Sequence, residues 1–339
     1  MSEFQLGLLI IGVLAIVGVI IYNRVQERLA RRQAERAFGS QHEDVLLGES
    51  APRREPTLEP VARKGEHEPG TSTQALPDEA LDYVISLSAQ RPLSVSAFFE
   101  YWGPLEHRFA RKALAAASED GSAWKRITQG DPGAYGAFQT ALQLVSRAGV
   151  AREGELIEFR SEIENLAVAL GATVVAPELK RVMAQARELD QFCADTDIQV
   201  ALNLMAGADG PFSAAKVDSA VVAAGLERSA DGTYALRDAE GSVLYTVSAA
   251  TGASEGECAK LGFYLDVPRV REVRKTYESM VRLAGQLAAG LGGMLVDDNG
   301  RELDEKSLAA IGAELDTVRQ ALERRGLPAG GPLALRLFS

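Results

Sequence analysis

The sequence predicts an α+β protein that begins with a single transmembrane helix and continues as antiparallel sheets with helices on one face. Three observations support this fold class. An uncharged apolar run occupies residues 6–22, and the C-terminal half alternates strand-like and helix-like segments. Several of those segments also recur about 120 residues apart, as expected of a tandem repeat.

Residues 6–22 read LGLLIIGVLAIVGVIIY, close to the ~20 apolar residues that cross a bilayer as a helix. A secretory signal peptide is the less favoured alternative, because Glu3 precedes the run and no small-x-small cleavage site follows it. Arginines cluster only after the run, and positive charge stays on the cytoplasmic side. We therefore expect residues 1–5 to be periplasmic and the remaining chain to be cytoplasmic.

Two further segments separate this anchor from the folded part. Residues 23–38 lack proline and glycine and contain five arginines, which predicts a basic juxtamembrane helix. Its arginines either contact anionic lipid headgroups or simply face solvent. Residues 39–77 contain five prolines and few large apolar side chains, so they are predicted to form a disordered linker.

Composition excludes several classes of function. The chain of 339 residues has 36 Lys+Arg against 47 Asp+Glu, a net charge of −11, which disfavours nucleic-acid binding. Two cysteines and three histidines exclude a disulfide scaffold and a Cys/His zinc module. No phosphate loop, nucleophile elbow or metalloprotease motif occurs, and Asp297-Asp298 is interpreted as a polar turn rather than an acid/base pair. We expect no catalytic residues, no metal and no cofactor.

The C-terminal half gives the clearest order of elements. Pro211 and Ser213 are placed to open a helix, and Gly292-Gly293 is placed to end one. Strands are predicted at 198–205, 233–237, 242–248, 262–267 and 294–296, and helices at 214–224, 269–291 and 303–325. This order is typical of a largely antiparallel sheet with helices on one face. Residues 326–339 are expected to form a flexible apolar tail, whose leucines could occupy a groove on the protein and compete with a partner.

Alternation within these strands separates a core face from an open face. Val243, Tyr245 and Val247 are assigned to the core, so the residues between them face outward. The predicted outward set is Leu202, Leu204, Thr233, Ala235, Leu244, Thr246, Ser248 and Tyr264. An open sheet face with few charges indicates a shallow binding surface. The alternative is a face covered by the neighbouring domain.

The N-terminal half of the folded part repeats this plan. Residues 82–88 match the first strand of the C-terminal half, and residues 119–122, 141–145 and 166–175 match 239–242, 262–266 and 287–296 in the same order. Four matches in order predict a diverged duplication. We expect a first repeat at 78–190 and a second at 195–325.

The second repeat resembles the C-terminal domain of the ZipA family of bacterial cell-division proteins. The resemblance covers about 197–325, and its best parts are VALNL at 200–204, AAGL at 223–226, FYLDVP at 263–268 and GGMLVDD at 292–298. The order of anchor, basic stretch, linker and α+β domain matches the family as well. Members of this family tie the tubulin-like GTPase FtsZ to the inner membrane.

The resemblance implies a split β-α-β sheet that binds the C-terminal peptide of FtsZ on its exposed face, without enzymatic activity or a cofactor. It places Leu204, Tyr264, Thr233, Ser248 and Ala250 in that groove. The expected localisation is the cell inner membrane, with inner-membrane lipid and FtsZ as partners in septum assembly. The alternative function is a membrane-tethered scaffold for a different cytoplasmic partner.

Two departures from the family stand out. Bulky methionines of the family's groove are replaced here by small residues, and no groove lysine is evident. The first repeat is additional to the single domain of the better-known members, and Gln143 takes the place of Tyr264 in it. We expect this degenerate repeat to support the second one or to bind other division proteins.

Overall fold

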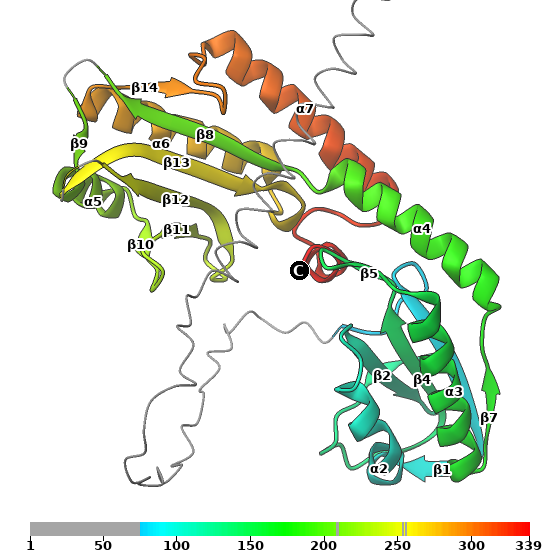
Figure 1. Ribbon diagram of the computed structural model, residues 1–339. Coiled ribbons are helices and arrows are strands. Elements are labelled where there is room, and N and C mark those ends of the chain that lie inside the picture. Colours follow the sequence, from blue (N-terminus) through cyan, green and yellow to red (C-terminus); the bar gives the residue numbers. More distant parts are fainter. Residues whose placement is uncertain (1–74, 208–209, 253, 255) are drawn as a thin grey trace, which may run out of the picture. The chain divides into compact units, whose positions relative to one another are not determined.

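The computed structural model describes residues 75–339 apart from 208–209, 253 and 255 (Figure 1). These residues belong to a compact unit, His67–Ser339. The predicted periplasmic residues 1–5, transmembrane helix 6–22, juxtamembrane helix 23–38 and linker residues 39–74 lie outside the described part of the chain. Within the described part, no helix combines the length and apolarity needed to span a membrane.

The prediction of an α+β fold with antiparallel sheets and helices is confirmed. The first sheet has the strand order β3-β2-β4-β1-β7, and every pairing in it is antiparallel. Its strands are β1 (Asp82–Ser94), β2 (Ala113–Ser118), β3 (Lys125–Arg126), β4 (Ala134–Gln143) and β7 (Ala172–Val175). The accompanying elements are α2 (Val95–Glu106), α3 (Glu153–Leu170), α4 (Leu179–Thr196) and the hairpin of β5 (Val145–Ser146) with β6 (Gly149–Val150).

The second sheet has the order β10-β11-β12-β13-β8-β14, with β9 paired to β13. Its strands are β8 (Gln199–Ala206), β9 (Phe212–Ser213), β10 (Glu227–Arg228), β11 (Tyr234–Arg237), β12 (Val243–Thr251), β13 (Glu257–Asp266) and β14 (Gly293–Val296). Its helices are α5 (Ala214–Ala223), the 3₁₀ turn η1 (Val267–Arg269), α6 (Val273–Leu291), α7 (Glu305–Arg324) and α8 (Pro332–Leu337).

Local sequence explains the boundaries of the helices in the second half. Pro268 falls in η1 between β13 and α6, where its ring and missing N–H stop the strand. The helix α6 ends at Gly292, which adopts a left-handed conformation with φ of 71°. Helix α7 begins at Asp304, whose side chain accepts a hydrogen bond from the backbone N–H of Ser307 at 2.7 Å.

The two sheets share a four-strand arrangement. The order β2-β4-β1-β7 in the first sheet corresponds to β12-β13-β8-β14 in the second. Along the chain, a helix follows β1 and another follows β8 and β9, and a long helix precedes both β7 and β14. The edges of the two sheets differ. The turn at 119–122 follows β2, which pairs with β4, whereas the turn at 239–242 precedes β12, which pairs with β13. These two turns therefore occupy different places, although their sequences look alike.

The strand register also corrects the residue in Tyr264's place. Tyr264 lies opposite Ala201 on β8, and the matching position on β1, Val84, lies opposite Ala141. Gln143 instead pairs with Asp82, at the place that Asp266 has in the second sheet. The row of Val84, Ala141 and Leu114 is buried on the face away from the main core.

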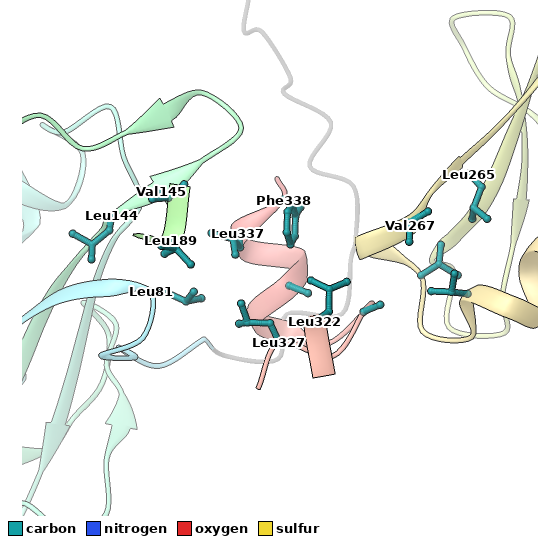
Figure 2. Packing of buried hydrophobic residues seen from close by; sticks show 14 of the residues in the cluster. Leu81, Leu144, Val145, Leu189, Leu265, Val267, Leu322, Leu327, Leu337 and Phe338 are labelled. Atoms are coloured by element: carbon teal, nitrogen blue, oxygen red, sulfur yellow. The ribbon is translucent and has the colours of Figure 1, made fainter. Parts of the chain in front are cut away.

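The C-terminal segment is packed into the fold rather than flexible, contrary to expectation. It forms α8, which contacts β5 and η1. Leu337 and Phe338 are each 1% exposed. Figure 2 shows them between Leu144 and Leu189 on one side and Val267 on the other. Burial of these apolar side chains in the cluster removes them from water, which stabilises the packed position of the segment 326–339.

A buried ion pair fixes this helix to the start of the first sheet. Arg336 Nη2 lies 2.8 Å from Asp82 Oδ2, and the two side chains are 2% and 0% exposed. Burial raises the pKa of Asp82 to about 6, although the guanidinium of Arg336 acts to lower it. Gln143 Nε2 also donates to the backbone oxygen of Arg336 at 3.1 Å.

A second charged contact joins the β5–β6 hairpin to the second sheet. Arg147, in the turn of this hairpin, places Nη2 2.6 Å from Asp197 Oδ1 and 2.8 Å from Asp266 Oδ1. Both carboxylates thus share one guanidinium, which raises the pKa of Arg147. Asp266 is the last residue of β13, so the first half of the folded unit contacts the end of the strand that bears Tyr264.

Candidate peptide-binding face

The second sheet has a core face and an outer face. The core face packs on α6 and contains fully or nearly fully buried side chains such as Tyr245, Val247 and Phe263. Strand pairing defines the outer face, which consists of Ala235, Thr246, Ser248, Ala250, Lys260, Gly262, Tyr264, Ala201, Asn203, Met205, Met294 and Val296. Because side chains alternate along each strand, these residues share one side of the sheet.

Most of the expected site residues lie on or beside this face. Ala235, Thr246 and Tyr264 form one row across β11, β12 and β13. Ser248 and Ala250 follow Thr246 along β12, and Leu244 precedes it on the same strand. Thr233 stands just before β11, where its hydroxyl donates to Asp231 Oδ1 at 2.7 Å.

The placement of Leu202 and Leu204 on the outer face is wrong. Both are 0% exposed, and they pair with Phe263 and Leu261 of the core face. The polar Asn203 between the two leucines favours the opposite choice, and an error of one residue reverses every side chain. The outward residues of β8 are Ala201, Asn203 and Met205.

Sequence reasoning missed a row of long side chains on the outer face. Lys260 lies opposite both Ala250 and Met205, and Met205 lies opposite Met294 on β14. Met205 and Met294 are 41% and 44% exposed. Alternation along β13 is a local signal that places Lys260 on the same face as Tyr264. No local sequence pattern indicates that β8 pairs with β14. The face therefore has both methionines and a lysine.

Tyr264 occupies the middle of the outer face in a specific pose. Its ring lies over Gly262, because a Cβ added to that glycine would stand 2.7 Å from Tyr264 Cζ. Gly262 pairs with Ser248 on one side and Asn203 on the other. Small neighbours thus leave room for the ring, which forms a flat aromatic platform.

Asn203 is the most enclosed polar side chain on this face. It is 3% exposed, and its Nδ2 donates to Asp298 Oδ1 at 3.0 Å. Asp297 accepts from the backbone N–H groups of Asn299 and Arg301, each at 2.8 Å, and the bond from Arg301 lowers the pKa of Asp297. Asp297 therefore stabilises the turn, and Asp298 holds the side chain of Asn203.

A groove of about 630 Å³ runs along one end of the outer face. Tyr264, Thr246 and Leu244 line its middle. Its charged lining has both signs, with Arg237 and Arg269 against Glu240 and Asp266. Leu335 of α8 also lines it. A larger cleft of about 770 Å³ lies between α5 and α6, away from the outer face.

The groove, the Tyr264 ring and the methionine row lie on one sheet face and together offer mainly apolar surface, with charged side chains of both signs at the groove. Such a surface suits an extended or helical peptide held mainly by hydrophobic contact. Methionine side chains adapt to the shape of a partner, so the exposed Met205 and Met294 favour binding over mere solvent exposure. The arrangement offers no nucleophile with an adjacent base.

Comparison with known families agrees with this geometry. Residues 199–314 match the model of the ZipA C-terminal FtsZ-binding domain. A comparison with curated proteins found no match. The matched residues run from the start of β8 into α7 and include all the strands of the second sheet. This part of the chain is therefore similar to the C-terminal FtsZ-binding domain of the ZipA cell-division proteins.

Proposed function

We propose that the chain tethers FtsZ to the cell inner membrane by holding the C-terminal peptide of FtsZ on the outer face of the second sheet. The observation that supports this most strongly is the exposed row of Met205 and Met294 on the same sheet face as Tyr264, within a domain similar to an FtsZ-binding family. Tethering of this kind supports assembly of the Z-ring and of the septum.

The membrane part of the proposal rests on the sequence. The apolar run 6–22 would cross the inner membrane, with residues 1–5 in the periplasm and the C-terminal sheets in the cytoplasm. The basic stretch 23–38 would meet anionic inner-membrane lipid. The segment up to residue 77 would then act as the tether between bilayer and sheets.

We also propose that the first sheet is a diverged copy of the second that no longer binds the peptide. The shared order of four strands supports the duplication. In the first sheet, the row equivalent to Ala201, Tyr264 and Thr246 is buried, as Val84, Ala141 and Leu114. The first sheet would instead support the second one or contact other division proteins.

Replacement of Tyr264 by alanine tests the proposed site. A labelled peptide of the host's FtsZ C-terminal tail, titrated into the full chain in mild detergent, should bind saturably by fluorescence anisotropy. Tyr264→Ala should raise the Kd at least tenfold, because a central aromatic anchor contributes more than ~1.4 kcal/mol. The affinity should change little with salt, since most contacts are apolar.

Tyr101→Ala is the matched control, because Tyr101 is 45% exposed on α2 and lies outside the second sheet. It should leave the Kd unchanged. Absence of saturable binding to the folded wild-type chain would contradict the proposed function. Equal effects of both substitutions would contradict the proposed location of the site.

A further inference from the structure

We propose that the C-terminal helix α8 forms a fixed end wall of the peptide-binding groove, and that Leu335 touches the bound FtsZ peptide. This inference rests on the proposed function and adds a contact from outside the residues 199–314 that match the family. Leu335 lines the same groove as Tyr264, Thr246 and Leu244. It is half-buried, so part of its side chain remains available to a ligand.

The helix is held from several directions. Ala334, Leu337 and Phe338 are all at most 1% exposed, and they flank Leu335 along the chain. The backbone oxygens of Arg336 and Phe338 accept hydrogen bonds from Gln143 and Arg269, at 3.1 Å and 3.5 Å.

Before α8, Gly330 donates its N–H to Pro268 O at 2.9 Å, which ties the incoming loop to η1. A substitution of Gly330 would bring its Cβ to 2.8 Å from the carbonyl carbon of Val270, so the loop approaches this backbone closely. The segment that carries Leu335 is thus anchored at both ends.

This anchoring decides between two roles for the tail. A competing plug would have to leave the groove when the peptide enters, which would expose Leu337 and Phe338 and break the Asp82–Arg336 ion pair. A wall stays in place and adds apolar surface to the bound peptide. Burial and the ion pair favour the wall over a competing tail.

The role of the first sheet follows from the same contacts. Asp82 of β1 and Gln143 of β4 hold α8, and Arg147 holds Asp266 at the end of β13. Asp266 itself lines the groove. The first half of the folded unit therefore fixes one end of the site that the second sheet provides.

Leu335→Ala tests the contact, with Leu333→Ala as the matched control. Both leucines are half-buried in the same helix, but only Leu335 lines the groove. In the full chain in mild detergent, Leu335→Ala should raise the Kd for the labelled FtsZ tail peptide about fivefold to tenfold. Leu333→Ala should leave it within about twofold, a change smaller than any single hot-spot contact produces.

A photocrosslinking measurement separates direct contact from a change in folding. A benzophenone amino acid at position 335 should crosslink to the bound peptide on irradiation, and the same group at position 333 should not. Tyr264→Ala should abolish the crosslink at position 335 if both residues line one occupied site.

The outcomes distinguish this inference from the function on which it rests. Wild-type binding that Tyr264→Ala weakens, with a normal Kd for Leu335→Ala and no crosslink from position 335, would overturn the wall and leave the proposed function standing. Equal losses for Leu335→Ala and Leu333→Ala without a crosslink would assign α8 a structural role only. Absence of wild-type binding would overturn both.

Discussion

Replacing Arg336 by methionine is expected to lower the free energy of unfolding by about 3–5 kcal/mol at pH 8. At this pH Asp82 is ionised, because burial raises its pKa only to about 6. Its carboxylate is 0% exposed and lies 2.8 Å from Arg336. The substitution therefore leaves a buried charge without its partner, and it also removes the hydrogen bond from Arg336 Nη1 to Leu76 O. Urea denaturation followed by circular dichroism measures the change.

Two controls make this result interpretable. The double variant Asp82→Asn, Arg336→Met should recover a large part of the loss, since it removes both buried charges. Arg160→Met breaks an exposed pair with Glu164, whose side chains are 41% and 49% exposed, and should cost at most about 0.5 kcal/mol. A free energy of unfolding for Arg336→Met equal to that of Arg160→Met would show that the ion pair does not hold the C-terminal helix.

The double substitution Met205→Asp, Met294→Asp is expected to weaken binding of the FtsZ tail peptide more than a hundredfold. The two residues lie opposite each other on β8 and β14, and both are more than a third exposed. A bound peptide would remove both new carboxylates from water, and the single ammonium of Lys260, opposite position 205, cannot neutralise the two of them. Each such burial costs well over ~1.4 kcal/mol, which is a factor of ten in Kd. Fluorescence anisotropy with the labelled peptide measures the loss.

The matched control places the same two charges elsewhere. Ile157 and Val168 are 51% and 82% exposed on α3, in the first half of the folded unit. Ile157→Asp, Val168→Asp should leave the Kd unchanged. Because all four side chains are partly in water, the melting temperatures of the two double variants should stay close to wild type. An unchanged Kd for the Met205, Met294 variant would exclude this row from the peptide site.

Local patterns in the sequence predicted much of the second sheet. The strand expected at 262–267 overlaps β13, Glu257–Asp266, and the helix expected at 303–325 matches α7, Glu305–Arg324. Pro268 follows the end of β13, and Asp304 caps the start of α7, so local chemistry sets these boundaries without knowledge of distant contacts. Alternation in VLYTVS likewise assigned Tyr245 and Val247 correctly to the core. Val243, assigned with them, is 36% exposed, because the register of β11 and β12 shifts beside it.

The errors have two different causes. Leu202 and Leu204 were assigned outward although the polar Asn203 between them favours the opposite face, and they lie opposite Phe263 and Leu261 in the core. The pairing of β8 with β14, which joins Met205 to Met294, connects residues far apart in the sequence.

The C-terminal tail was misassigned for a related reason. Glycines and prolines around 326–332 indicate a loop, and nothing nearby reveals a partner for the arginine in LALRLFS. Its partner, Asp82, is separated from Arg336 by 254 positions. Burial of Leu337 and Phe338 likewise depends on side chains from both halves of the folded unit.

The most direct test of the central claim uses the protein's own methionines. The chain has five, namely Met1, Met183, Met205, Met280 and Met294. Met205 and Met294 lie on the outer face, whereas Met280 is 0% exposed in α6 on the core side of the sheet and Met183 belongs to α4. Carbon-13 labelling of the methyl groups gives one NMR signal for each residue. On titration with the FtsZ tail peptide, the Met205 and Met294 signals should shift saturably while those of Met183 and Met280 stay in place. Saturable binding that leaves Met205 and Met294 unmoved would contradict the assignment of the outer face as the FtsZ site.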